Sequence, residues 1–264
     1  MSSSILEDAF FTIDDDLRGI FRYPLENPET SSLFLLGIGA LILADRPLTS
    51  YYQDKVEPIF GDFALPSLNL GPSFSAFSRE SQYVYAGIVG SYALGVALND
   101  EKAQTAAVLA TKAVAYSYLT SHVLLKSAIG RNRPVQNLST FEGDPGDFTT
   151  NPLDFGNYHG VDLLSDAYGT AMPSFHTTLY FSVARVYAGV YDNYWVPYSM
   201  AGVLFASNVK GHRHWVSDMV AAAFIGTVIG EVVLDGYYGA RADSISITPL
   251  VSSDEVGMYF SKSF

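Results

Sequence analysis

The sequence contains no cysteine, so disulfide bonds and thiol chemistry are excluded. It also lacks internal repeats, low-complexity segments and a linker rich in Pro, Gly or Ser, and we therefore expect a single domain over residues 1–264. Basic residues are scarce: 15 Lys and Arg against 27 Asp and Glu give a net charge of −12. That balance argues against nucleic acid, or an anionic membrane surface, as a partner held by bulk charge. The first residues have no basic segment followed by a long apolar one, so they do not form an intact signal peptide.

Long apolar runs are present, but polar or charged residues interrupt them. Their length and their Ala, Leu, Val and Tyr content predict core helices near 31–45, 81–98, 102–128, 175–191, 195–208 and 214–234. A bilayer-spanning helix needs about 20 mostly apolar residues. Because of the interruptions we favour a soluble or membrane-peripheral bundle over a multi-span membrane protein. Residues 135–172 predict a long functional loop, and the tail 245–264 predicts a small C-terminal β-hairpin.

Three short segments carry the candidate chemistry, and the first is GHRHWVSDMVAAA, residues 211–223. If a helix begins near His214, Asp218 lies one turn further on the same face. Its carboxylate can then accept one imidazole N–H, which leaves the other ring nitrogen as a nucleophile or base. Taken alone, this common spacing favours an ordinary surface ion pair over a catalytic one.

The second segment, AMPSFHTTLYFSVARVY at 171–187, places Pro173 and Ser174 just before a helical run. Ser174 is expected to be the N-cap, with its hydroxyl bonded to a backbone N–H of the first turn. Such a helix end attracts phosphate, and His176 in that turn could protonate a leaving group. The alternative is a capped helix with a histidine at its boundary.

The third segment is KSAIGRNRP, residues 126–134. Lys126 ends an apolar helix, Gly130 suits the position after the C-cap, and Pro134 blocks continuation. Lys126 and Arg133 can both reach one anion, since Arg grips two phosphate oxygens and Lys adds a point charge. Lysine near a helix C-terminus is also favoured by the helix dipole alone.

Taken together, the ordered patterns KxxxxxxRP, PSxH and SxxxxxxHxxxD resemble the type 2 phosphatidic acid phosphatase superfamily. That group includes lipid phosphate phosphatases, bacterial acid phosphatases and vanadium-dependent haloperoxidases. The matching residues are Lys126, Arg133, Pro134, Pro173, Ser174, His176, Ser207, His214 and Asp218. The resemblance implies an all-α, single-domain helical bundle of the acid phosphatase and vanadium haloperoxidase type, with the motif-bearing catalytic core within 100–235.

The resemblance also implies roles for the residues. His214 is the nucleophile that forms a phosphohistidine, Asp218 orients it, and His176 is the general acid. The phosphate oxygens are held by Lys126, Arg133, Ser174 and the backbone N–H of Phe175. No metal or other cofactor is expected.

Two positions depart from the family pattern. Phe175 stands where the family usually has Gly, and its ring either lines the pocket or packs in the core. Asn208 stands where the family usually has a phosphate-gripping Arg, and it donates only neutral hydrogen bonds. Lys210 or Arg213 could supply the missing charge, and the loss argues against a vanadate cofactor.

Three further residues stay open. Arg131 is read either as a cation at the rim of the site or as a solvent-facing side chain. His122 and His159 are read as surface or satisfied core histidines rather than site residues.

From the resemblance we expect a metal-independent phosphatase that hydrolyses a phosphomonoester or pyrophosphate, most plausibly lipid-linked. Lipid A, phosphatidate, phosphatidylglycerophosphate and polyprenyl diphosphate all remain open as substrates. The alternatives are a broad-specificity soluble acid phosphatase and a non-catalytic phosphate-binding protein. Members of this family commonly work in the periplasm or at the outer face of a bacterial membrane, and we expect the same location here, with peripheral membrane association. The oligomeric state stays open.

Overall fold

The structure is a computed structural model that describes residues 5, 9, 11–68, 78–158, 160, 168–208, 213–243, 245–251 and 256–262. Side chains are described up to residue 239. Two residues singled out from the sequence, His159 and Lys210, lie outside the described residues.

The fold is all-α, as predicted. In chain order the helices are α2 (Ile13–Glu26), α3 (Pro28–Tyr51), α4 (Glu57–Phe60), α5 (Arg79–Leu98), α6 (Glu101–Ser117), α7 (Lys126–Ile129), α8 (Phe175–Tyr191), α9 (Trp195–Ser207) and α10 (Val216–Asp243). Two π-helical segments, Tyr52–Val56 and Tyr118–Leu125, join α3 to α4 and α6 to α7. The predicted hairpin is present, with β1 (Ile245–Val251) paired antiparallel to β2 (Val256–Lys262).

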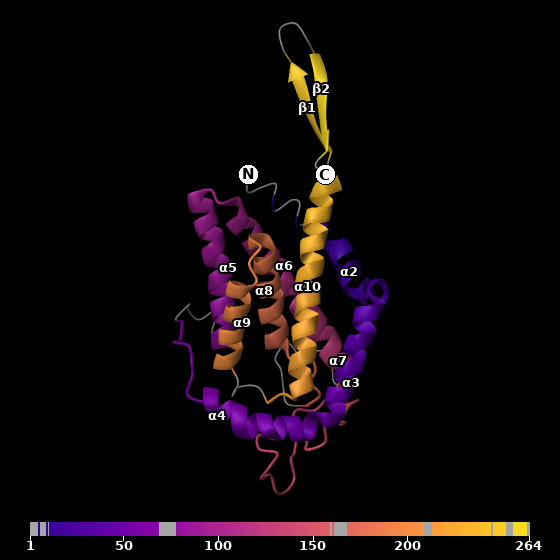
Figure 1. Ribbon diagram of the computed structural model, residues 1–264, viewed down its shortest axis with the longest axis vertical. Coiled ribbons are helices and arrows are strands. Elements are labelled where there is room, and N and C mark those ends of the chain that lie inside the picture. Colours follow the sequence, from indigo (N-terminus) through magenta and orange to yellow (C-terminus); the bar gives the residue numbers. More distant parts are fainter. Residues whose placement is uncertain are drawn as a thin grey trace.

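Helix α8 lies at the centre of the bundle, packed against α10, α6 and α9 (Figure 1). The close approach of α8 and α10 depends on a small residue. A side chain at Gly226 of α10 would come within 2.4 Å of the Thr178 backbone oxygen on α8. On α6, fully buried alanines serve the same purpose and leave room for the larger side chains of α8. Small residues at the contacts therefore bring the helices that carry the site close together.

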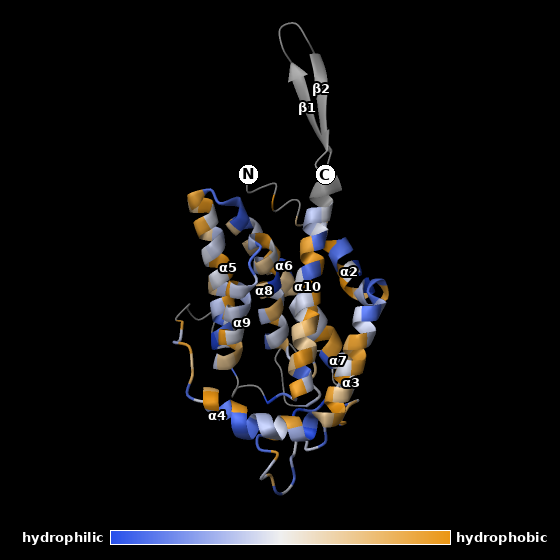
Figure 2. Cartoon of the chain, viewed as in Figure 1, coloured by the Kyte–Doolittle hydropathy of each residue, from blue (hydrophilic) through white to orange (hydrophobic). Residues whose placement is uncertain are grey.

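Helix α3 departs from the sequence analysis, which treats every long apolar segment as a core helix. Helix α3 runs along the outside of the bundle beside α10 and then turns across its base (Figure 1). Only 17 % of its apolar window is buried, against 50 % for α10. Among the described residues, these two helices are long and apolar enough to cross a membrane. Much of the apolar surface of α3 therefore lies outside the core, as the orange residues of Figure 2 show.

The loop between α7 and α8 begins with a sharp reversal at Gly130. This residue has φ +57°, and a Cβ there would lie 2.8 Å from the backbone of Asn157, so only glycine fits. Two short bridges, Arg131 to Thr170 and Pro134 to Thr149, then tie the loop to itself. The long predicted loop is thus fastened to the first motif over its described part.

Candidate active site

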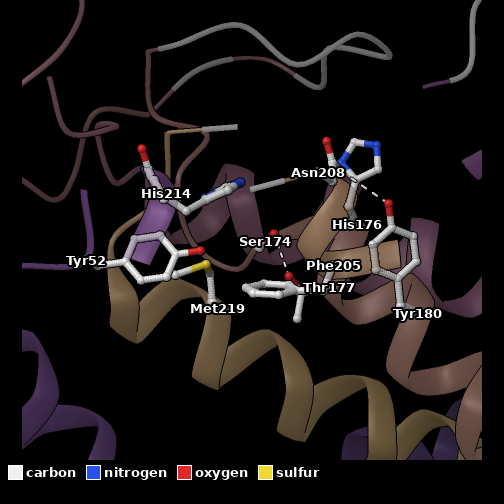
Figure 3. A pocket seen from close by; sticks show the side chains of 10 residues that line it. Tyr52, Ser174, His176, Thr177, Tyr180, Phe205, Asn208, His214 and Met219 are labelled. Carbon is white, nitrogen blue, oxygen red and sulfur yellow. Dashed lines mark hydrogen bonds between the residues drawn. The ribbon is translucent and has the colours of Figure 1, made fainter. Parts of the chain in front are cut away.

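One pocket lies at the end of the bundle where α8 and α10 begin (Figure 3). It holds about 30 Å³, roughly the share of one water molecule in the liquid. Its lining residues come from the segment that follows α3, the start of α8, the end of α9 and the start of α10: Tyr52, Glu57, Ser174, His176, Thr177, Tyr180, Phe205, Asn208, His214 and Met219. The structure therefore brings both candidate histidines into one small pocket, although 38 positions separate them in the sequence.

His214 precedes α10 by two residues, so the helix begins slightly later than expected. Its Nδ1 lies 3.6 Å from Oδ2 of Asp218, which is longer than a hydrogen bond. In unliganded sites such contacts are often long and shorten when substrate binds. The same Asp218 oxygen accepts the backbone N–H of Trp215 at 2.9 Å. The carboxylate thus closes the first turn of α10 and also faces the imidazole.

A buried network behind Asp218 was missed by the sequence analysis. Arg131 donates to Oδ1 of Asp218 at 2.6 Å and to Oδ2 of Asp45 at 2.7 Å. Asp45 also accepts the backbone N–H of Ser217 at 2.9 Å, and it is bonded to the Ser217 hydroxyl. All three charged side chains are fully buried. Both readings of Arg131, at the rim or facing solvent, are therefore wrong, because two carboxylates draw the guanidinium inside.

Ser174 is the N-cap residue of α8, but its hydroxyl does not cap the helix. The hydroxyl instead accepts a hydrogen bond from Thr177 at 3.1 Å, because Thr177 lies one turn on and turns inward. The predicted capping bond is thus wrong, while the predicted place of Ser174 in the pocket holds. The first-turn N–H groups, including that of Phe175, remain at the helix end where the dipole favours an anion.

The ring of Phe175 packs in the core. It contacts the rings of Tyr118, His122 and His176 with centroids 5.4–5.7 Å apart, and it borders the main hydrophobic cluster. Of the two readings left open, the structure therefore supports core packing. His122 is itself buried and stacks on Tyr118, as the core reading expects.

Lys126 and Arg133 are buried, 2 % and 8 % exposed, and neither side chain lines the pocket itself. Burial lowers the pKa of the Lys126 ammonium well below its usual range; neighbouring Arg133 lowers it further, whereas Asp218 raises it. Arg133 is held by the Thr170 hydroxyl, which accepts from Nε at 3.1 Å. Two confined cations that repel each other favour the arrival of an anion, which would reverse the shift at Lys126.

Asn208, at the end of α9, also lines the pocket, and its amide donates to the Tyr180 hydroxyl at 3.2 Å (Figure 3). The Ser207 side chain leaves the pocket instead and donates to Glu80 at 3.1 Å. Arg213 also points elsewhere: it donates to Gln136 and covers the Phe148 ring in a neighbouring hollow of about 820 Å³. Arg213 therefore does not replace the missing arginine in this arrangement.

Residues of the N-terminal part complete the pocket and were not identified from the sequence. Tyr52 and Glu57 reach it from the segment that follows α3. Thr49 accepts the backbone N–H of Val216 at 3.1 Å and so fastens α3 to the start of α10. No simple sequence pattern marks these residues. The π-helical distortion at Tyr52–Val56, a feature that often accompanies functional sites, is visible only in the structure.

Two imidazoles and a helix N-terminus meet at one small pocket, and two buried cations, Lys126 and Arg133, lie outside its lining. This combination is typical of a hydrolase that handles phosphate. Among the described residues, no three His, Asp or Glu side chains gather closely enough to hold a metal ion. A comparison with family models matches residues 105–241, slightly more than half of the chain, to the PAP2 superfamily. The chain belongs to the PAP2 superfamily, and membership implies phosphatase activity. Comparisons with curated proteins and with solved structures gave no match.

Proposed function

We propose that the protein is a metal-independent phosphatase that works through a phosphohistidine. The observation that carries the proposal is the presence of His214 and His176 in one pocket beside the α8 N-terminus. Phosphoryl transfer demands little covalent chemistry from a protein, so positioning and charge stabilisation supply most of the rate enhancement. The residues around this pocket provide both.

In the proposed first step, Nε2 of His214 attacks phosphorus while Nδ1 faces Asp218. The bond from phosphorus to the ester oxygen breaks, and His176 gives its proton to the departing oxygen. In the second step, neutral His176 takes a proton from water, whose oxygen attacks phosphorus. The bond from phosphorus to nitrogen breaks, releasing inorganic phosphate and restoring both imidazoles. Lys126, Arg133 and the α8 backbone N–H groups stabilise the charge on the phosphoryl oxygens.

The mechanism requires opposite protonation states of the two histidines. His214 must be neutral to attack, so activity falls as pH is lowered and this imidazole gains a proton. His176 must be protonated to donate, so activity falls again as pH is raised. A bell-shaped dependence of kcat/KM on pH is expected. A flat profile between about pH 5 and 9, measured with chemistry rate-limiting, would contradict two titrating imidazoles.

The direct test is to trap the intermediate. Purified protein is mixed with a ³²P-labelled phosphate ester, quenched in alkali and examined for acid-labile label. Wild type is expected to carry label on His214, and the His214→Ala variant is expected to carry none. Turnover without any labelled protein, under conditions where hydrolysis of the intermediate is slow, would refute the covalent route. Wild-type protein that binds phosphate without turnover would instead support the non-catalytic alternative.

We further propose that the substrate is lipid-linked and that the enzyme is membrane-associated. Support comes from apolar side chains exposed next to the pocket: Ile59, Phe60 and Phe63 follow Glu57, which lines it. Leucines of α3 and the Trp195 ring on α9 extend exposed apolar surface along the bundle. Large exposed apolar patches mark contact with a partner or a lipid phase.

Two measurements separate this from a soluble acid phosphatase with small substrates. The kcat/KM for detergent-dispersed phosphatidate is expected to lie well above that for p-nitrophenyl phosphate. The Ile59→Ser variant is expected to lower kcat/KM for phosphatidate and to leave that for p-nitrophenyl phosphate unchanged. Equal values for the two substrates would favour the soluble alternative. Hydrolysis of p-nitrophenyl phosphate by intact cells, without entry of the substrate, would support the proposed periplasmic or outer-face location.

A further inference from the structure

The segment that follows α3, which we call the elbow (residues 52–60), is fixed to both sides of the catalytic pocket. The Gln53 amide donates to the Val135 carbonyl at 2.8 Å, and its oxygen accepts the Leu138 N–H at 2.9 Å. One turn earlier, Thr49 accepts the N–H of Val216. These bonds join the elbow to the loop after the first motif and to the helix after His214. These bonds fix the backbone of the elbow relative to the segments that carry the motifs.

Tyr52 is one of two elbow residues that line the pocket, the other being Glu57. Figure 3 shows its hydroxyl directed inward beside Met219, on the same side of the pocket as His214. The hydroxyl oxygen is buried and has no hydrogen-bond partner among the described residues. A buried polar group without a partner is costly, and such groups in native structures call for an explanation. A ligand oxygen in the pocket would satisfy this one.

The chemistry of the hydroxyl suits an anionic ligand. Burial raises the pKa of the Tyr52 phenol above its usual range, and the Glu57 carboxylate raises it further. Tyr52 therefore remains protonated wherever the enzyme works and is a hydrogen-bond donor. A neutral donor at this place also adds no charge to a site for which the proposed mechanism already uses Lys126 and Arg133.

The opposite side of the pocket explains why another donor is needed. The family's arginine is replaced by Asn208, which carries no charge and donates one of its two amide N–H groups to the Tyr180 hydroxyl. Arg213 is turned toward Gln136. The groups that bind phosphate on this side are thus weaker than the family pattern implies. The elbow lies outside the region matched to the family, and its Tyr52 hydroxyl is a donor without a partner among the described residues.

We propose that Tyr52 is a catalytic residue whose hydroxyl donates a hydrogen bond to a non-bridging oxygen of the phosphoryl group. The inference rests on the proposed function, because it assigns the same pocket to a phosphate ester. The bond strengthens as negative charge grows on the phosphoryl oxygens in the transition state. It compensates in part for the absent arginine from the other side of the pocket.

The test is Tyr52→Phe, which keeps the ring and removes only the donor. We expect kcat/KM for p-nitrophenyl phosphate to fall about 10- to 100-fold, mostly in kcat, as for loss of one transition-state donor. Tyr51→Phe is the matched control: Tyr51 is the neighbouring residue, is 63 % exposed and lies outside the pocket. Its kinetics are expected to match wild type. Wild-type kcat/KM in Tyr52→Phe, or an equal loss in Tyr51→Phe, would overturn the proposal.

Measurements of stability and of phosphate binding test the role of Tyr52 without relying on turnover. The melting temperature of Tyr52→Phe is expected to equal or exceed that of wild type, because an unsatisfied hydroxyl is removed. Calorimetric titration with inorganic phosphate is expected to show weaker binding in Tyr52→Phe than in wild type. If wild type lacks turnover but this difference persists, the proposed function fails and the Tyr52 contact stands. If the two proteins bind phosphate equally, or neither binds it, the Tyr52 proposal fails.

Discussion

The two histidines of the pocket are held very differently. On the His214 side, Asp218 is bonded to Arg131, Arg131 to Asp45, and Asp45 to the start of α10, all without exposure to solvent. The next residue, Trp215, is fully buried and donates its indole N–H to the Asn132 carbonyl at 3.0 Å. On the His176 side, the imidazole lies against the rings of Phe175 and Tyr180, and Asn208 donates to the Tyr180 hydroxyl.

The difference follows from what each imidazole is proposed to do. A nucleophile must approach phosphorus along one line, and a misplacement of about 1 Å can cost a hundredfold in rate. A general acid must reach leaving groups that differ among substrates, and the ring contacts around His176 are compatible with that task. The comparison therefore predicts unequal consequences when each side is altered.

The largest effect is expected from His214→Ala. Without its nucleophile the proposed covalent route is closed, and kcat should fall by about 10⁴-fold or more. Circular dichroism and the melting temperature should stay near wild type, because His214 precedes α10 rather than forming part of it. A folded variant that keeps substantial activity would show that another residue attacks phosphorus.

His176→Ala is expected to have a smaller effect that depends on the leaving group. General acid catalysis contributes about 10²–10⁴-fold, and an alkyl phosphate should show the full loss. With p-nitrophenyl phosphate the loss in the first step should be much smaller, because p-nitrophenolate departs without a proton. Burst kinetics with both esters isolate that step. Identical losses for the two esters would argue against proton donation by His176.

Asp45→Asn tests the support behind His214. Removing the Asp45 charge leaves the buried Arg131 guanidinium with one carboxylate partner in place of two. The free energy of unfolding should therefore fall by about 3 kcal/mol. Denaturant titration measures this loss, and kcat should decline with it. The control is Asp14→Asn, since the exposed pair between Asp14 and Arg18 should contribute less than about 1 kcal/mol. Equal stability changes in the two variants would show that the buried network adds no support.

The smallest effect is expected on the His176 side, from Asn208→Arg. A charge-assisted bond is about twice as strong as a neutral one, so KM for p-nitrophenyl phosphate should fall about 3- to 10-fold. Asn208→Gln, which adds length without charge, is the control and should show no such gain. A higher KM in the arginine variant would mean that the bond from Asn208 to Tyr180 matters more than added charge.

Much of the site was predictable because its motifs are local. The helix periodicity around residues 175–191 and the reversal at Gly130 were read correctly, and Ser174, His176, Asn208 and His214 do share one pocket. The errors concern single contacts. The cap at Ser174 failed because a neighbouring threonine hydroxyl bonds to the serine. Arg131 was misplaced because the carboxylates that draw it inside lie 86 and 87 residues away.

The sequence alone determined the helical segments, the three motifs and their order, because helix periodicity and turn residues act over a few neighbours. Only the tertiary structure decided which distant groups complete the pocket. Asp45, Thr49 and Tyr52 follow no motif, and they become part of the site because α3 packs beside α10 and its elbow crosses the base of the bundle. Helix packing depends on the shapes of whole surfaces, so such long-range contacts leave no local pattern in the chain.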